Sequence, residues 1–344
     1  MILPDFVVEN PRTVEEAVRA LATGNGAMPL AGGTALIPAL KLGLHAPTVL
    51  VDLASVEGLC TLDCRGAGAY VGATTPLSVL ATEPRVWAGW RALAQAAAAV
   101  GGPQLRNVGT IGGNICLDTR CWYHDRTGLW RQAAGRCLKR GGDVCLAVPR
   151  SDRCHAVFAA DTPPALIALG ARVRTAHWSG RECITREREL GDVYRDEGRC
   201  WLQLDPGEII THVLIPPVIS PGEHRSGYLK YRLRGSIDFP LASVAVGLRL
   251  ADGCMKDVRV VLGGVASAPV PALEAMRELE GREPSAELAA RAARATALAA
   301  SPAPNQASTP GQRRLMITVM AERLFNELSG TRYPLAYPDQ EAMR

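Results

Sequence analysis

The chain has 344 residues, of which 47% are hydrophobic and 21% are charged, and its formal net charge is +4. This length suffices for two or three domains with buried cores, and the composition excludes disordered and fibrous proteins. The small net charge gives no ground for nucleic-acid binding. The longest apolar runs, such as 241–250, are too short to span a membrane. Ten cysteines and no secretory signal predict a cytoplasmic protein whose clustered thiols bind metal rather than form disulfides.

Helix and strand patterns alternate along most of the chain. They predict a helix after Thr13, β-rich runs at 28–30 and 48–53, a strand at 69–73 and an alanine-rich helix at 90–100. Further along they predict strand-like segments at 164–170 and 171–175, a closing strand at 207–217, strands at 242–250 and 257–265, and two C-terminal helices at 286–300 and 312–328. In the last helix, the residues expected to face the core are Leu315, Val319, Met320 and Leu324.

Two similar glycine turns follow β-rich segments. They are Ala31-Gly32-Gly33-Thr34 and Thr110-Ile111-Gly112-Gly113-Asn114. Paired glycines let a backbone approach a phosphate closely, and successive N–H groups can then point at the anion. Either turn alone is more simply a structural turn, but the pair predicts a pyrophosphate held between two subdomains. A Rossmann site fits poorly, because Pro29 stands where the third glycine after Gly24 and Gly26 belongs.

Four cysteines lie between the second glycine turn and the following Asp161. Their intervals are 16, 8 and 9 residues, and they are Cys121, Cys137, Cys145 and Cys154. Four thiolates suit an iron–sulfur cluster or zinc, although zinc sites usually place ligands in pairs two to four residues apart. Unligated, redox-labile thiols are the third alternative. Cys116 and a nearby histidine remain possible substitutes for one of the four ligands.

The cysteine segment is also basic. Residues 119–155 hold eight Lys or Arg against three Asp, a local charge of 8 − 3 = +5. This excess indicates either a solvated loop or a surface that attracts an acidic partner protein. Arg136, Lys139 and Arg140 are the cations expected to serve such docking.

The two turns together resemble those of the FAD-binding subunits of the xanthine dehydrogenase and carbon monoxide dehydrogenase family. The resemblance extends to Asp161-Thr162-Pro163-Pro164-Ala165-Leu166 and to Tyr228-Leu229-Lys230-Tyr231, and so covers nearly the whole chain. In one respect the sequence departs from the usual family pattern. Asn114 and Asp161 are 47 residues apart, farther than in most family members, and the additional residues between them contain all four cysteines. Such an insertion is similar to that of the β subunits of 4-hydroxybenzoyl-CoA reductases, where it carries an additional [4Fe–4S] cluster.

The resemblance implies an α+β fold of the medium-subunit type, with a two-subdomain FAD-binding unit and a C-terminal α+β domain. The expected FAD-binding subdomains are residues 1–56 and 57–220, and the second contains the insertion at about 116–156. The C-terminal domain is expected at 221–330, followed by a tail at 331–344. The FAD residues it implies are Pro29, Leu30, Ala31, Gly32, Gly33, Thr34, Ala35 and Leu36 on one wall, Gly101, Gly109, Thr110, Gly113 and Asn114 on the other, Asp161 at the ribose or adenine side and Lys230 near the isoalloxazine. Without the resemblance, Asp161 would be read as a helix cap or turn residue.

The function implied is electron transfer. The resemblance predicts FAD and a [4Fe–4S] cluster in this chain, a molybdenum-cofactor subunit and a [2Fe–2S] subunit as partners in a dimer of heterotrimers, and ferredoxin as the electron donor. Electrons would pass from ferredoxin through the cluster and FAD to the partner, which would reduce 4-hydroxybenzoyl-CoA to benzoyl-CoA. The alternative is an FAD subunit of a xanthine or CO dehydrogenase-type hydroxylase, which passes electrons outward. A zinc-stabilised binding module and a free-standing FAD enzyme are further alternatives.

Overall fold

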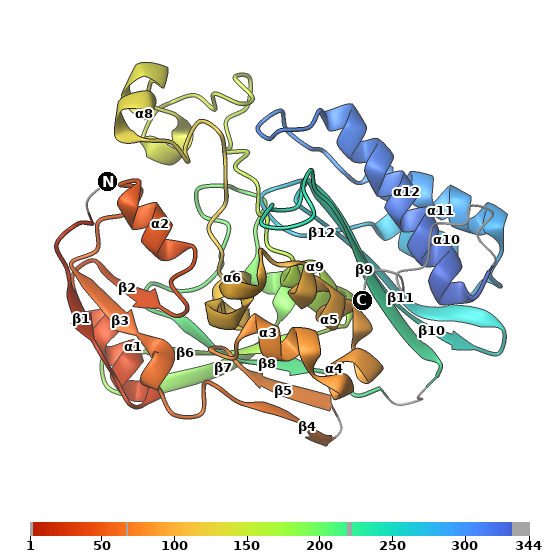
Figure 1. Ribbon diagram of the computed structural model, residues 1–344, viewed down its shortest axis with the longest axis horizontal. Helices are drawn as coiled ribbons and strands as arrows, with labels where there is room; N and C mark the ends of the chain where they lie inside the picture. Colours follow the sequence, from red (N-terminus) through yellow and green to blue (C-terminus); the bar gives the residue numbers. More distant parts are fainter. Residues whose placement is uncertain (1–2, 67, 219–221, 332–344) are drawn as a thin grey trace.

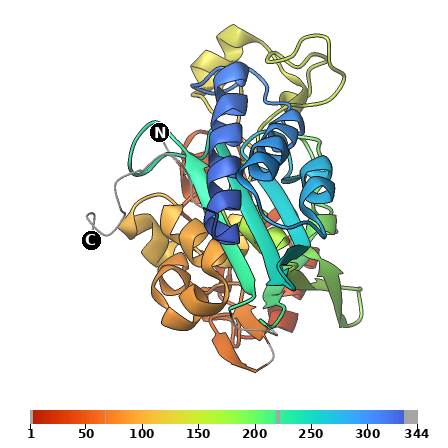
Figure 2. The same cartoon turned by 90° about the vertical axis from the view of Figure 1, so that its right-hand side faces the viewer.

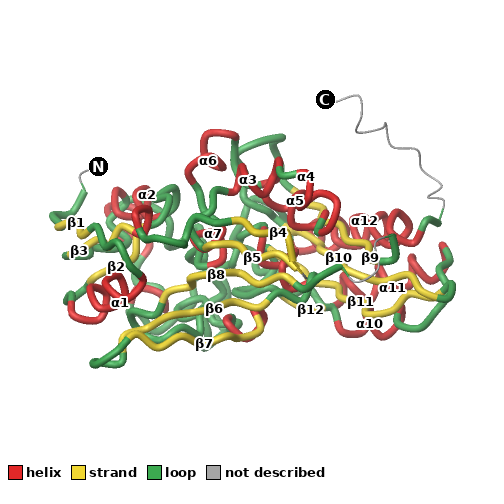
Figure 3. Tube along the Cα trace, turned by 90° about the horizontal axis from the view of Figure 1, so that it is seen from below, coloured by secondary structure: helices red, strands yellow, loops and turns green. Residues whose placement is uncertain are grey.

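The computed structural model describes residues 3–66, 68–218 and 222–331. Three separate sheets and the helices packed on them form one row, with the first and smallest sheet at one end (Figures 1 and 3). Strands and helices do not alternate along the chain to build a single parallel sheet, so the fold is of the α+β class, as expected from the sequence.

The N-terminal unit is a three-stranded parallel sheet in the order β1-β3-β2, with one helix on it and a second at its edge. Its elements are β1 (Val7–Glu9), α1 (Val14–Thr23), β2 (Ala27–Leu30), α2 (Leu36–Lys41), β3 (Val49–Asp52) and η1 (Leu53–Ser55). The helix after Thr13 begins as predicted, because Thr13 and Glu16 form a reciprocal capping box. The first glycine turn connects β2 to α2, so it lies at the carboxyl end of a strand.

The central unit is a five-stranded antiparallel sheet in the order β4-β5-β8-β6-β7, covered on one face by short helices (Figure 3). Its elements are β4 (Leu62–Gly66), β5 (Gly68–Gly72), α3 (Leu77–Thr82), α4 (Pro84–Gly89), α5 (Arg91–Ala99), α6 (Pro103–Val108), α7 (Ile111–Ile115), α9 (Thr162–Ala168), β6 (Arg172–Trp178), β7 (Cys183–Glu189), η3 (Leu190–Val193) and β8 (Ile209–Ile215). The core between sheet and helices is apolar and includes Leu80, Leu93, Ile111, Val173 and Val213.

The C-terminal unit is a four-stranded antiparallel sheet with three helices on one face; α12 lies over the strands and runs roughly along them in Figure 2. Its elements are β9 (His224–Tyr231), β10 (Ala242–Ala251), β11 (Cys254–Gly263), β12 (Val270–Pro271), α10 (Leu273–Leu279), α11 (Ala286–Leu298) and α12 (Pro310–Ser329). Helix α5 of the central unit packs on β9, so the two units share a buried boundary.

The insertion projects from the fold as mostly irregular chain, with only α8 (Gly128–Ala134) and η2 (Leu138–Arg140) as regular elements (Figure 1). Residues 120 and 157 pair in a short bridge at its base. All four predicted metal ligands are therefore carried by loop or by the edge of a short turn.

Three sequence expectations about elements are wrong. Residues 164–170 are not a strand but belong largely to α9, because Pro163 and Pro164 occupy its first turn, where proline is pre-set for a helix. The described part of the C-terminal unit has three helices rather than the expected two, because the short helix α10 precedes α11 and α12. The expected core-facing stripe of α12 is wrong in part: Met320 and Leu324 are buried as predicted, but Leu315 is 56% exposed, and Arg313, outside that stripe, is fully buried.

The division of the chain at 56 and 220 stays a prediction, and residues 332–344 of the expected tail lie outside the described residues. No helix among the described residues is long and apolar enough to cross a membrane.

Candidate functional site

The first glycine turn presents unused backbone donors. Among the described residues, no acceptor is found for the N–H groups of Gly32, Gly33 and Thr34. Gly33 has φ +66°, a left-handed conformation that side-chain-bearing residues rarely adopt, so the turn depends on glycine here. Successive free N–H groups between a strand and a helix form a concave donor set that suits a phosphate oxygen.

The second glycine turn is internally satisfied. The N–H of Gly112 donates to the Ala73 carbonyl oxygen at 2.8 Å, and the N–H of Gly113 donates to Thr110 Oγ1 at 3.1 Å. The Asn114 side chain, nearly buried, accepts from the N–H and the hydroxyl of Thr162 through Oδ1. The second turn therefore forms a rigid side of the predicted phosphate site, and the first turn supplies its free N–H donors.

The two turns touch through their backbones. A Cβ placed on Gly32 would lie 2.0 Å from the carbonyl oxygen of Val108 and 3.0 Å from the Cα of Gly109. Thr34 Oγ1 lies near the same place, 3.4 Å from where a Cβ of Gly109 would be. Glycine at position 32 is thus required by close approach, and the structure brings together two segments that are 78 residues apart in sequence, as the sequence predicted.

Gly101 lies at the end of α5 with φ +47°. Its carbonyl oxygen accepts from the N–H of Ile237 at 3.1 Å and from the hydroxyl of Ser236 at 3.3 Å, both in the loop between β9 and β10. A loop of the C-terminal unit is thereby fixed against the wall of the predicted flavin site.

Asp161 and Lys230 form a buried ion pair. Both side chains are 4% exposed; Lys230 Nζ donates to Asp161 Oδ2 at 2.9 Å and to the Ala99 carbonyl oxygen, and the Tyr228 hydroxyl donates to Asp161 Oδ1 at 2.6 Å. Burial raises the pKa of Asp161 and lowers the pKa of Lys230, because both charged forms lose water. Asp161 occupies the N-cap position of α9, yet its side chain makes no cap hydrogen bond. The pair joins α9, β9 and the end of α5.

The four predicted metal ligands line one enclosed cavity in the insertion. Cys137, Cys145 and Cys154 are buried and Cys121 is half-buried. Burial raises the pKa of Cys121 to about 12 and that of Cys154 to about 11, so these thiols resist ionisation while no metal is bound. Cys116 does not line this cavity, which agrees with its exclusion from the ligand set.

The walls of the cavity lie close together. Its volume is about 10 Å³, the space of roughly one water molecule. Within the described part of the chain, no group of three or more His, Cys, Asp or Glu side chains is arranged to hold a metal ion. The structure therefore gathers the four thiols around one point without setting them in coordination geometry.

Lys139 lies beside the cysteines and points inward. It lines the same cavity, is 8% exposed, and donates through Nζ to Asp118 Oδ1 at 2.6 Å and to the Thr119 carbonyl oxygen. Arg140 is half-buried and donates to the Arg131 carbonyl oxygen. The placement of Lys139 does not match a role in docking a partner, because its ammonium is buried and paired with the half-buried Asp118, whereas Arg136 of the same expected set is exposed.

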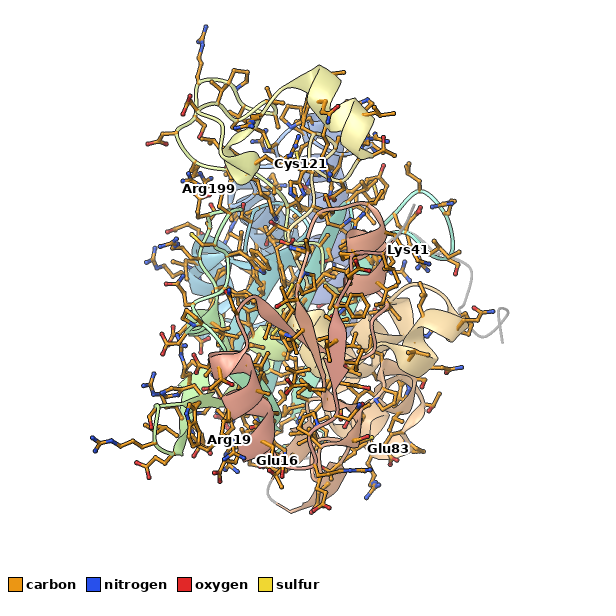
Figure 4. The ribbon with its side chains drawn as sticks, turned by 90° about the vertical axis from the view of Figure 1, so that its left-hand side faces the viewer. Glu16, Arg19, Lys41, Glu83, Cys121 and Arg199 are labelled. Atoms are coloured by element: carbon orange, nitrogen blue, oxygen red, sulfur yellow. The ribbon has the colours of Figure 1, made fainter. Side chains whose placement is uncertain are left out.

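The insertion is attached to the N-terminal unit through residues that carry no recognisable sequence motif. Arg131, 7% exposed, donates through Nη2 to the carbonyl oxygens of Leu42 and Gly43 at the end of α2. Asp118 bridges Lys139 to His45, whose Nε2 lies 3.4 Å away. In Figure 4, Cys121 in the insertion and Lys41 at the end of α2 lie toward the same end of the molecule. The helix that follows the first glycine turn is thereby tied to the cysteine segment.

Comparison with known proteins decides the family. Residues 4–218 match the FAD binding domain in molybdopterin dehydrogenase, and residues 227–328 match the CO dehydrogenase flavoprotein C-terminal domain. The chain belongs to this flavoprotein family. It is an FAD-binding subunit of the xanthine/CO dehydrogenase type of molybdenum hydroxylase, which is the family that the two glycine turns indicated.

Individual relatives agree with this assignment. The aldehyde oxidoreductase FAD-binding subunit PaoB of Escherichia coli is 34% identical over 276 residues, which cover 77% of this chain and 82% of that protein. The carbon monoxide dehydrogenase medium chain of Afipia carboxidovorans is 28% identical over 283 residues, 82% of each chain. The solved carbon monoxide dehydrogenase of Hydrogenophaga pseudoflava superposes with a TM-score of 0.77 at 25% identity, covering 97% of this chain and 100% of that one. The expected medium-subunit fold is confirmed.

Proposed function

We propose that this flavoprotein subunit holds FAD between its two glycine turns. The observation that carries the proposal is the close approach of Gly32 to Val108, which places the free N–H groups of Gly32, Gly33 and Thr34 against a rigid second wall. These groups would receive the diphosphate. The remaining predicted residues, from Pro29 to Leu36 on one wall and Gly101, Gly109, Thr110, Gly113 and Asn114 on the other, would complete the site.

Asp161 and Lys230 have a different role in this proposal from the one their motifs suggested. Each already has a buried partner, so we place them behind the flavin wall, where they fix α9 against β9 and the end of α5. When bound, FAD supplies two-electron and one-electron chemistry, which lets the chain connect substrate oxidation to single-electron carriers. The protein's part is to bind the diphosphate and position the ring.

We further propose that the insertion binds a [4Fe–4S] cluster through Cys121, Cys137, Cys145 and Cys154. The donor set fits, because four thiols line one cavity and three of them are buried among apolar side chains. Binding would release protons, since the thiols must ionise to become ligands. The segment that carries them is mostly loop, which can adjust around a cluster more readily than helix or strand.

The complex in which this chain works is proposed to be a cytoplasmic assembly with a molybdenum-cofactor subunit and a [2Fe–2S] subunit, in a dimer of heterotrimers. Two directions of electron flow are open to it. Relatives named as an aldehyde oxidoreductase subunit and a carbon monoxide dehydrogenase chain favour oxidation of a substrate such as an aldehyde, with electrons leaving through FAD. The four-cysteine insertion is the observation that favours the second candidate, reduction of 4-hydroxybenzoyl-CoA with ferredoxin as donor.

The first experiment is anaerobic purification of the complex, separation of this subunit, and assay of flavin, iron, acid-labile sulfide and zinc. FAD with about four irons and four sulfides per chain supports the proposal. Cys145→Ala is expected to lose iron and sulfide and retain FAD, whereas Cys254→Ala, a half-buried cysteine of β11, should retain all three. Zinc, or FAD without metal in the wild type, would reject the cluster and leave an ordinary flavoprotein subunit.

A second experiment separates the two directions. The purified complex is mixed with an aromatic aldehyde and an artificial acceptor in one assay, and with 4-hydroxybenzoyl-CoA and reduced ferredoxin in another. Acceptor reduction in the first assay alone supports the oxidative direction. Formation of benzoyl-CoA in the second supports the reductase.

A further inference from the structure

Helix α2 carries the first glycine turn but is weakly packed. The Gly33 carbonyl oxygen accepts from the N–H of Ile37 at 3.0 Å, so the turn belongs to the hydrogen-bonded frame of the helix. The helix has six residues, and among them Leu40 alone is buried. A helix shorter than about 12 residues is marginal in water without tertiary support. The position of α2 therefore depends on the contacts at its two ends.

The carboxyl end of α2 closes in a Schellman motif. Gly43, with φ +64°, donates through its N–H to the Leu40 carbonyl oxygen at 2.9 Å. The N–H of Leu44 donates to the Ala39 carbonyl oxygen at 3.0 Å. The carbonyl oxygens of Leu42 and Gly43 lie beyond these last helical hydrogen bonds. The end of the helix thus offers two acceptors to a donor from elsewhere in the chain.

Arg131 of the insertion supplies this donor. Its Nη2 lies 3.1 Å from the Leu42 carbonyl oxygen and 3.0 Å from that of Gly43, and the residue is 7% exposed. Hydrogen bonds from a charged donor are stronger than those between neutral groups. Helix α8, which contains Arg131, and α2 are neighbours in Figure 1. The insertion therefore holds the carboxyl end of the helix that begins at the glycine turn.

Asp118 makes a second link between the insertion and the chain that follows α2. Its Oδ2 lies 3.4 Å from Nε2 of His45, and its Oδ1 accepts from Lys139 Nζ at 2.6 Å. Lys139 belongs to η2, where the adjacent Arg140 donates to the Arg131 carbonyl oxygen at 3.2 Å. Both links thus meet at η2, so they brace the same end of α2 together.

We propose that the insertion positions the first glycine turn for FAD, with Arg131 as the principal positioning residue and Asp118 as its support. Gly32 fixes the amino end of α2 against Val108, and Arg131 fixes the carboxyl end, so the free N–H groups keep one arrangement. When the carboxyl end is released, the turn spends less time in the arrangement that fits a diphosphate. The apparent affinity for FAD then falls in proportion. This inference rests on the proposed FAD site and is independent of a cluster at the four cysteines.

The test is the rate at which FAD leaves the purified complex after dilution, followed by the rise in flavin fluorescence. Arg131→Met should release FAD about 10-fold faster, equivalent to about 1.4 kcal/mol, which is less than a charged hydrogen bond contributes. Arg131→Lys keeps a charged donor and should recover part of this loss. Asp118→Asn should release FAD about 3-fold faster, because it weakens only the second link.

Arg153→Met is the matched control, because Arg153 also ties the insertion to the rest of the chain, but through Asp196 and not through α2. It should release FAD at the wild-type rate. A wild-type rate in Arg131→Met overturns the proposal. Equal acceleration in Arg131→Met and Arg153→Met, or no recovery in Arg131→Lys, also overturns it, because the insertion would then act only as general support.

Two further outcomes are distinguishable from these. Where the Arg131 variants do not assemble, Asp118→Asn decides: faster release supports the proposal, and the wild-type rate overturns it. A wild-type complex without FAD, or a Gly32→Ala complex that retains it, refutes the proposed FAD site and this inference with it. FAD that is lost in Gly32→Ala but is retained normally in Arg131→Met refutes the positioning role alone.

Discussion

The buried pair of Asp161 and Lys230 gives the sharpest quantitative prediction. Replacing Asp161 by Asn keeps the shape of the side chain and a hydrogen-bond partner for the Tyr228 hydroxyl, but it removes the negative charge beside Lys230. Because both side chains are 4% exposed, water cannot compensate the ammonium that is left behind. The change therefore isolates the electrostatic part of the contact.

The expected magnitude follows from burial. Removing one partner of a buried ion pair destabilises a protein by about 3–5 kcal/mol, because an uncompensated charge remains in a poorly solvating place. Replacing both partners by neutral groups is far less costly, since the attraction and the desolvation penalty disappear together. Asp161→Asn and Lys230→Met should each lower the free energy of unfolding by about 3–5 kcal/mol, and the double variant should lose less than either single one.

The assay is urea unfolding of the full-length chain, followed by circular dichroism, for the wild type, both single variants and the double variant. Strong non-additivity is the signature to look for. Single-variant losses below about 1 kcal/mol, or losses that simply add in the double variant, would refute the reasoning, because they would show a pair that is effectively solvated.

Three other perturbations test other parts of the structure. Gly32→Ala would place a methyl group 2.0 Å from the Val108 carbonyl oxygen, so we expect about 3 kcal/mol of destabilisation and a loss of bound FAD, measured by unfolding and flavin content. Burial lowers the pKa of His212 from its ordinary value of 6.5, so the unfolded chain takes up that proton first, and stability should fall as pH drops below about 6.5. His212→Phe, which keeps the stacking on Tyr70, should flatten this dependence in unfolding at several pH values. Arg131→Met should speed amide hydrogen exchange at the end of α2, because two carbonyl oxygens there lose their donor.

Controls exist for these variants within the same chain. Gly128→Ala, where a Cβ meets nothing within 4 Å, should leave both stability and flavin content unchanged. Arg136→Met, at an exposed arginine of the same insertion, should not change exchange in α2. Wild-type flavin content in Gly32→Ala would contradict the assignment of the first turn. An unaltered pH slope in His212→Phe, or unaltered exchange in Arg131→Met, would show that the contact in question carries no stability.

Local sequence determined much of this protein. The Thr13 capping box begins α1, the first glycine turn follows strand β2, and the four cysteines stand out by number and proximity. The second glycine turn does not follow a strand as expected: it comes after α6 and begins α7. The cap and the turns are set by neighbours within a few residues, and the cysteines lie within one segment of 34 residues, so local sequence suffices to find them. The same short-range reasoning failed at 164–170, where an apolar run reads equally well as a strand or as a buried helix.

Tertiary structure alone decided what these segments meet. The contact of Gly32 with Val108, the pairing of Asp161 with Lys230, and the burial of Arg313 each join residues that are far apart in the chain. Asn305 shows the same limit, because a polar residue in a loop gives no sign that its Oδ1 will be buried without a partner. A sequence determines which groups can bind or donate, but burial removes water and thereby decides which of them must find a partner and which are left open for a ligand.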